Sequence, residues 1–243
     1  MFRREGPARS PRTNAALAGF LALIAGFVNS GGFILVGSFT SHVTGSLGRL
    51  ADDAARTDLA AALSAAILIG GFFAGAVIAS LIIESRSPRT RYGLALLAES
   101  AALLAFVFVT ELARSSHPRV LDAQALLLCL AMGMQNAMVT RLSGAVVRTT
   151  HLTGVVTDLA IEAASWYRWH RAKLPVISRL FGAPPERPDG DRVLVLGTIM
   201  VGFTLGSLAG AALTLRASRW AMLAPAIATL AASGFAFYQR REA

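Results

Sequence analysis

Two short polar segments carry most of the residues in this chain that have useful chemistry. The first, 37–48, follows an apolar run and contains hydroxyl groups, glycines and the imidazole of His42. The second, 149–158, places His151 in a similar setting. An imidazole titrates near neutral pH, so each histidine is a candidate proton carrier or gate, with a hydrogen-bonded structural role as the alternative. Free helix N-termini beside such residues favour anions and carboxylates.

The two polar segments are copies of each other. Residues 40–55 align with residues 149–164 without a gap at a constant offset of 109, and eight of the sixteen aligned positions are identical. Two of the four histidines therefore fall at equivalent places, which chance alanine matches do not explain. The identical pairs include the residues with chemistry: Thr40 with Thr149, His42 with His151, Thr44 with Thr153, and Gly45 with Gly154.

Glycines and amides extend the repeat beyond these segments. The stretch 26–29, which ends in Asn29, matches 133–136, which ends in Gln135 and Asn136. Glycines four residues apart recur in both halves and predict close helix packing, within the chain or in a homo-oligomer. These glycines are Gly71 and Gly75 in one half, and Gly202 and Gly206 in the other.

The composition places these halves in a membrane. Hydrophobic residues make up 54% of the 243 residues and charged residues only 15%, and Leu59–Ile83 has no charged side chain over 25 residues. A bilayer core takes about 20 apolar residues as helix. We therefore expect an all-α, polytopic membrane protein of about six transmembrane helices, at 15–37, 59–83, 93–112, 120–140, 193–215 and 220–238.

The predicted organisation is two membrane repeats after a basic tail. The tail is 1–14, the first repeat 15–113 and the second 120–238, which includes an aromatic and basic loop at 166–192 that we expect at the membrane interface. Three spans in each half invert the second half relative to the first, as in many secondary transporters. The polar segments then break helices, and the two breaks meet near the midplane; the alternative is that both are extramembrane turns with Thr44 and Thr153 as caps.

Basic residues predict the orientation. With the N-terminus inside, 17 Lys and Arg fall on the cytoplasmic side and 6 on the other. This bias predicts a bacterial inner-membrane protein with both termini in the cytoplasm. The net charge of +9 is spread over short segments between apolar spans, so we expect the lipid bilayer, and no nucleic acid, as its partner.

Polar groups within the spans complete the candidate site. Glu99 lies within an apolar span, where a carboxyl group is costly unless it has a partner, which makes it a functional candidate or a packing partner. The residues expected to bind a solute are Asn29, Thr40, His42, Thr44, Gly45, Glu99, Gln135, Asn136, Thr149, His151, Thr153 and Gly154.

Two stretches of the chain, which contain the polar segments, resemble a known family. GFVNSGGFILVGSFTSHVTGS and AMGMQNAMVTRLSGAVVRTTHLTG are similar to the two signature regions of the YoaK family, bacterial membrane proteins of unknown function. The resemblance covers nearly the whole chain and implies a six-helix or similar membrane protein without an established substrate. The family commonly has Asp at the position of Asn29, and often Asn at those of Ser46 and Val155, which weakens any proton-coupling role for position 29.

Three classes of function follow. Inverted halves with matched polar breaks favour a permease for an unknown small solute that works by alternating access. No motif of a known enzyme, metal site or cofactor site occurs, and the single cysteine, Cys129, excludes a cysteine cluster, so we expect no enzyme activity, metal or cofactor. The alternatives are a structural or regulatory membrane protein and a membrane-embedded enzyme that uses His42, Asp53, His151 and Glu162.

Overall fold

The computed structural model describes residues 10–87, 90–112, 118–143, 149–172 and 187–239. Within these ranges the chain is helical apart from short connections and has no strand, which confirms the all-α class for this part. The elements are α1 (Pro11–Val36), α2 (Val43–Ala55), α3 (Leu59–Ser85), α4 (Arg91–Leu112), α5 (Pro118–Ser143), α6 (Leu152–Ala172), α8 (Gly190–Ala217), η2 (Ser218–Met222) and α9 (Leu223–Gln239).

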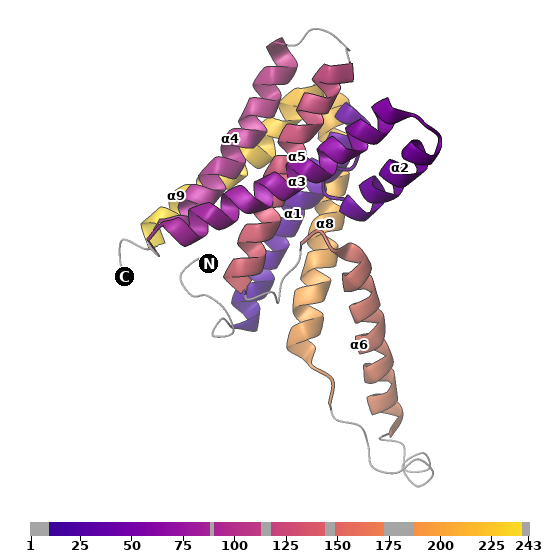
Figure 1. The fold of residues 1–243 in the computed structure, drawn as a ribbon. Helices are drawn as coiled ribbons and strands as arrows, with labels where there is room; N and C mark the ends of the chain where they lie inside the picture. Colours follow the sequence, from indigo (N-terminus) through magenta and orange to yellow (C-terminus); the bar gives the residue numbers. More distant parts are fainter. Residues whose placement is uncertain (1–9, 88–89, 113–117, 144–148, 173–186, 240–243) are drawn as a thin grey trace.

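Among the described residues, five helical stretches are long and apolar enough to cross a bilayer: Pro11–Val36, Leu59–Ser85, Arg91–Glu111, Leu121–Ser143 and Gly190–Tyr238. The last holds both the fifth and the sixth predicted spans, because α8, η2 and α9 follow one another without a break. The chain reverses direction at η2 (Figure 1), where Ser218 has a φ of 51°. Large apolar side chains such as Phe73 are exposed on these helices, as lipid contact requires. The chain is a multi-pass integral membrane protein.

Aspartates precede the first turns of α3 and α8, the long helices that come after α2 and α6 in the chain. Asp58 precedes α3, and its side chain accepts a hydrogen bond from the backbone N–H of Ala61. Asp189 precedes α8 and accepts from the backbone N–H groups of Asp191 and Arg192. These carboxylates satisfy donors that the first helical turn leaves free. The two caps are 131 residues apart, as are Gly71 and Gly202.

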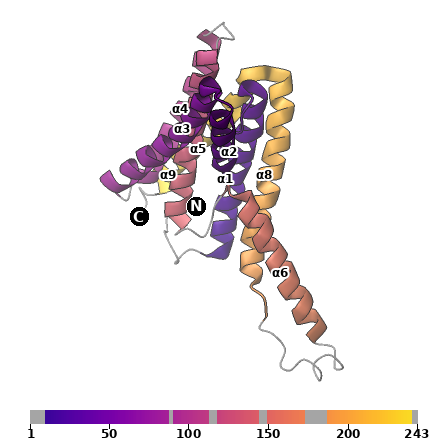
Figure 2. The same ribbon diagram turned by 45° about the vertical axis from the view of Figure 1, so that its right-hand side comes forward.

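Glycine contacts make two equivalent helix pairs. In both views α1 runs along α8 (Figures 1 and 2), and α3 packs across α5. A Cβ atom on Gly206 of α8 would collide with the backbone carbonyl of Leu23, and one on Gly75 of α3 would collide with that of Leu130. Only glycine allows the backbones to approach so closely, which is its expected use between membrane helices.

In the same two helix pairs, glycines of α1 and α5 also lie against backbone carbonyls of α8 and α3. A Cβ atom on Gly26 would collide with the carbonyl group of Phe203, and one on Gly133 with that of Phe72. The contact residues of α1 and α5 correspond at an offset of 107, which relates Gly26 to Gly133 and Leu23 to Leu130. Their contact residues in α3 and α8 correspond at an offset of 131. The first long helix of each half therefore packs against a long helix of the other half, with equivalent residues in contact.

A third interface repeats in the same way. Ser100 of α4 donates a hydrogen bond to the carbonyl of Ala226 in α9 at 2.8 Å. Ser233 of α9 donates to the carbonyl of Gly93 in α4, also at 2.8 Å. Each hydroxyl has its counterpart 133 residues away in the other helix. α4 and α9 are thus equivalent helices of the two halves, and each contributes the same contacts to their interface.

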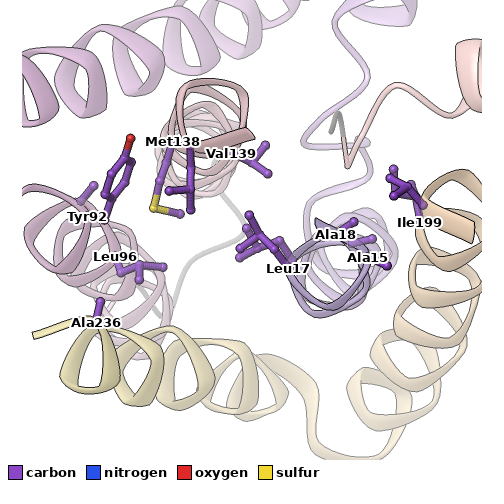
Figure 3. Packing of buried hydrophobic residues seen from close by; sticks show 14 of the residues in the cluster. Ala15, Leu17, Ala18, Tyr92, Leu96, Met138, Val139, Ile199 and Ala236 are labelled. Atoms are coloured by element: carbon purple, nitrogen blue, oxygen red, sulfur yellow. The ribbon is translucent and has the colours of Figure 1, made fainter. Parts of the chain in front are cut away.

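The core lies between α1, α4, α5 and α9. Figure 3 shows Leu17, Leu96, Met138 and Ala236 converging from these four helices. Burial of such side chains from lipid and water fixes the positions from which the polar segments start.

The predicted interfacial loop starts later than expected. Residues 166–172, which contain Trp166, Tyr167 and Trp169, belong to α6, and the chain becomes helical again at Gly190. Trp166 and Trp169 are near each other, with ring centroids 5.5 Å apart, because i and i+3 share one helix face. Residues 173–186 of this predicted loop lie outside the described ranges.

Candidate functional site

Both polar segments connect a long helix to a shorter polar one. α1 ends at Gly37, which has a φ of 71°, and α2 begins at Val43. In the second half, 149–151 lead from the end of the connection into α6, and 144–148 are outside the described ranges. Burial repeats along the copies: Thr40 and Thr149 are buried, whereas both histidines are exposed.

An asparagine anchors each segment to the preceding long helix. The Oδ1 atom of Asn29 accepts hydrogen bonds from the backbone N–H of Ser41 at 3.2 Å and from its hydroxyl at 3.0 Å. The Oδ1 atom of Asn136 accepts from the hydroxyl of Thr150 at 2.7 Å. The Nδ2 group of Asn136 donates to the carbonyl of Met132 on its own helix. The amide oxygens thus have a positioning role in both halves.

Each histidine ring covers the glycine three residues later. A Cβ atom on Gly45 would lie 2.6 Å from Nε2 of His42, and one on Gly154 would lie 2.5 Å from Nδ1 of His151. Both contacts place the imidazole against the first turn of α2 or α6. The glycine of each H-x-x-G copy is explained by the space that this ring occupies.

A pocket of about 260 Å³ lies between the two segments. The anchored hydroxyl residues, Ser41 and Thr150, face it from opposite halves. No charged side chain of the described ranges lines it. Its lining is Asn29, Phe39, Ser41, His42, Thr150, Leu152, Thr153 and Phe203. The structure therefore brings the two polar segments together, as the repeat predicts.

A second pocket, of about 630 Å³, opens between α6 and the first turns of α1 and α8. His151 and Gly154 line this pocket rather than the shared one. Its described lining is rich in carboxylates, since it holds Asp158, Asp189 and Asp191 beside one guanidinium group, that of Arg192. Arg192 pairs with Asp158 at 3.2 Å and with Glu162 at 3.4 Å. The two histidines of the repeat thus face different spaces.

Glu99 and Gln135 lie in the packed core, away from both pockets. Each is 0% exposed. The Nε2 group of Gln135 donates to the backbone carbonyl of Leu21 at 3.2 Å, while its Oε1 atom has no donor in the described part of the chain. Neither carboxylate oxygen of Glu99 has a hydrogen-bond partner there. These two predicted site residues are therefore not at the pocket.

The other predicted residues divide by burial. The hydroxyls of Thr40 and Thr149 are buried and have no hydrogen-bond partner in the described ranges. Thr44 and Thr153 are both exposed, and of the two only Thr153 lines one of the pockets described above.

Five pocket residues were absent from the predicted site. Ser41 and Thr150 carried a usable signal, because they are a hydroxyl pair at equivalent positions of the repeat. Phe39, Leu152 and Phe203 carried none, since apolar residues in membrane proteins are expected to face lipid or the core. Among the residues that the structure describes, no group of three or more His, Cys, Asp and Glu side chains is arranged to hold a metal ion.

Comparison with protein-family models matches residues 17–235 to one family, described as "Protein of unknown function (DUF1275)". The match includes both polar segments and Glu99. No curated protein and no solved structure matches the chain significantly. The YoaK name stays a prediction, consistent with this match.

Proposed function

Since the chain belongs to the DUF1275 family, whose function is unknown, its activity has to be argued from its own residues, and we propose that it is a small-solute permease working by alternating access. The observation that carries the proposal is the pocket shared by the two polar segments. Asn29 and Ser41 enter it from one half, and Thr150 and Thr153 from the other. A site built from corresponding breaks in two repeats is the arrangement that alternating access uses.

The course of the helices supports inverted halves. α1 and α5 occupy equivalent places in the two halves and run in opposite directions (Figure 1). Their buried residues agree, because Leu21 of α1 shares a cluster with Met138, whereas Val28 shares one with Leu128. Two copies of one motif that point in opposite directions are able to bind one solute alternately from either side.

The lining of the pocket favours a small polar solute without net charge. Hydroxyl, amide and imidazole groups offer hydrogen bonds, and the phenyl rings of Phe39 and Phe203 supply apolar surface. Among the described residues, no carboxylate, ammonium or guanidinium group lines the pocket to neutralise a charged solute. Such a mixture of apolar walls and a few polar groups is typical of small-molecule sites.

The different packing of α2 and α6 at the two ends of the protein supports a mechanism in which these ends open alternately. The pocket of about 630 Å³ gives access along α6, where α6 packs less closely along α8 than α2 does along α3. In the proposed cycle α6 closes onto α8 while α2 separates from α3. The positive-inside bias assigns the α6 end to the cytoplasm of a bacterial inner membrane.

Counterflow in proteoliposomes tests this function. The purified chain is reconstituted and assayed with radiolabelled polyols, sugars, amides, amino acids and nucleosides. We expect exchange of one class, and a five- to hundredfold weaker affinity for Thr150→Val, because a hydrogen bond in the pocket costs about 1–3 kcal/mol when it is left unmade.

Thr157→Val is the matched control. The Thr157 hydroxyl is exposed and donates to the carbonyl of Thr153 on its own helix at 3.0 Å, so its loss should leave exchange unchanged. The permease would lose its support if folded protein exchanged no solute of the panel. Equal effects of the two substitutions would remove the pocket from the mechanism.

A further inference from the structure

Glu99 is a buried carboxyl group that the proposed permease cycle does not use. It is 0% exposed, and both of its oxygens lack a hydrogen-bond donor in the described part of the chain. A carboxylate with no donor and no cation is strongly disfavoured at membrane depth. A neutral carboxylic acid is not, and it carries one O–H donor.

An acceptor without a donor lies at the same level of the core. Leu96 of α4 shares a cluster with Met138, near which it lies in Figure 3, and Leu103 shares another with Met132. Glu99 lies between Leu96 and Leu103 on α4, just as Gln135 lies between Met132 and Met138 on α5. Because the Nε2 group of Gln135 is held by the Leu21 carbonyl, its Oε1 atom points away from that bond and still has no donor.

We propose that Glu99 binds a proton and that the protonated carboxyl group donates to Gln135 on α5. The proton comes from water and binds to one carboxylate oxygen; its release leaves a carboxylate facing the lone pairs of an amide oxygen, so α4 and α5 then repel each other at this level. Protonation therefore favours the close α4–α5 packing, and deprotonation favours its separation.

α5 links this site to the shared pocket. Asn136 follows Gln135 directly, and its Oδ1 atom accepts the hydroxyl of Thr150, which lines the pocket. A shift of α5 at Gln135 consequently moves the anchor of the second polar segment. This coupling rests on the proposed permease function, whereas proton binding by Glu99 does not.

The described titratable groups leave Glu99 without a counter-ion. Arg141 of α5 pairs with Glu84 of α3 at 2.5 Å, and Arg219 of η2 binds Glu111 near the end of α4. None of these groups pairs with Glu99. The titratable side chains described on the elements packed against α4 are Glu84 of α3; Asp122, Cys129 and Arg141 of α5; Arg219 of η2; and Tyr238 of α9; α4 itself adds Arg91, Tyr92 and Glu111.

The repeat indicates how many protons each chain binds at this level of the core. Ser100 and Ser233 occupy equivalent positions in the α4–α9 interface, so the counterpart of Glu99 is Ala232. Only one half carries this carboxyl group. One proton per chain is therefore bound at this level.

Infrared spectroscopy of the full chain in lipid nanodiscs tests proton binding directly. The probe is the proton itself, in a pH series recorded in H₂O and in D₂O. We expect the parent protein to show the carbonyl band of one protonated carboxyl group, which shifts in D₂O and is lost in Glu99→Gln. Glu84→Gln, which removes a carboxyl of the exposed ion pair with Arg141, should keep the band.

A band that persists in Glu99→Gln overturns the proposal, as does its absence from the parent protein at every pH at which the protein is folded. If Glu99→Gln does not fold, Glu99→Asp replaces it; this variant keeps the carboxyl group, and its band should change frequency, because the shorter side chain ends farther from Gln135. An unchanged band in Glu99→Asp also overturns the proposal. Solute exchange that proceeds without any pH dependence removes the coupling and leaves the permease intact.

Discussion

The two halves of this protein have equivalent contacts between their long helices, but their shorter polar helices, α2 and α6, pack differently. Gly75 meets the Leu130 carbonyl as Gly206 meets that of Leu23, so the central helix pairs are copies in the same register. At the ends, by contrast, α2 lies closely along α3, while α6 leaves a large pocket beside α8. In the proposed mechanism, the pairs α1–α8 and α3–α5 form a closely packed scaffold, and the two polar ends adopt different positions on it.

The largest expected effect comes from the scaffold. Gly75→Ala and Gly206→Ala each place a methyl group against a backbone carbonyl that has no room to move, and we expect each to destabilise the protein by about 3 kcal/mol. Thermal unfolding followed by size-exclusion chromatography measures this. Because the two sites are equivalent, their effects should be equal within about 0.5 kcal/mol.

Gly70→Ala is the control for Gly75→Ala. Nothing lies within 4 Å of its added Cβ atom, so the substitution should stabilise α3, by up to about 1 kcal/mol. If Gly75→Ala were as stable as Gly70→Ala, the close approach of α3 and α5 would be wrong.

The next effect distinguishes the two asparagine anchors. Asn29→Ala leaves both the backbone N–H and the hydroxyl of Ser41 without their acceptor. Asn136→Ala removes the acceptor of the Thr150 hydroxyl, which is able to rotate toward another acceptor, and the Nδ2 donor to the Met132 carbonyl of the same helix. We expect losses of about 2 and about 1 kcal/mol, respectively, in thermal unfolding. Asn29→Asp keeps an acceptor and should be more stable than Asn29→Ala; the reverse order would contradict the anchoring role.

A smaller effect tests the shared pocket against the symmetry of the sequence. Thr44 and Thr153 are copies, so the repeat alone predicts equal consequences of substitution by valine. The structure predicts that only Thr153→Val weakens binding of the transported solute, by about tenfold, or roughly 1.4 kcal/mol, because only Thr153 lines the pocket. Counterflow competition gives the affinities, and a larger effect at Thr44 would refute this placement.

The smallest effect concerns the histidine rings. Gly45→Ala and Gly154→Ala push against imidazoles that are able to rotate away, so the stability cost should stay below about 1 kcal/mol. The displaced rings should instead react faster with diethyl pyrocarbonate. Unchanged reactivity in both variants would argue against the contact between ring and glycine.

Much of the architecture could be predicted from the sequence, because its signals are local. Apolar length fixed the long helices to within a few residues, and identical residues at a constant offset located both polar segments. The helical start of the loop at 166–172 was not predicted, since aromatic and basic residues that favour a membrane interface are equally compatible with helix.

The site was predictable only as far as the repeat reaches. Ser41 and Thr150 could have been selected from their alignment, but the separation of His42 and His151 into different pockets depends on how far α6 stands from α8. The core position of Glu99 depends on which face of α4 meets α5. Neither tertiary fact is encoded in spacing along the chain.

The central claim is that the two ends exchange positions, and distance measurement by pulsed electron paramagnetic resonance tests it most directly. Spin labels are attached in a Cys129→Ala background at exposed, equivalent pairs: Leu47 with Leu63 for α2 and α3, and Val156 with Leu194 for α6 and α8.

The account predicts two populations for each pair in lipid nanodiscs, with the α2–α3 distance short when the α6–α8 distance is long. Conditions that lengthen one distance must shorten the other. A single fixed distance for both pairs, or distances that lengthen together, would contradict alternating access in this protein.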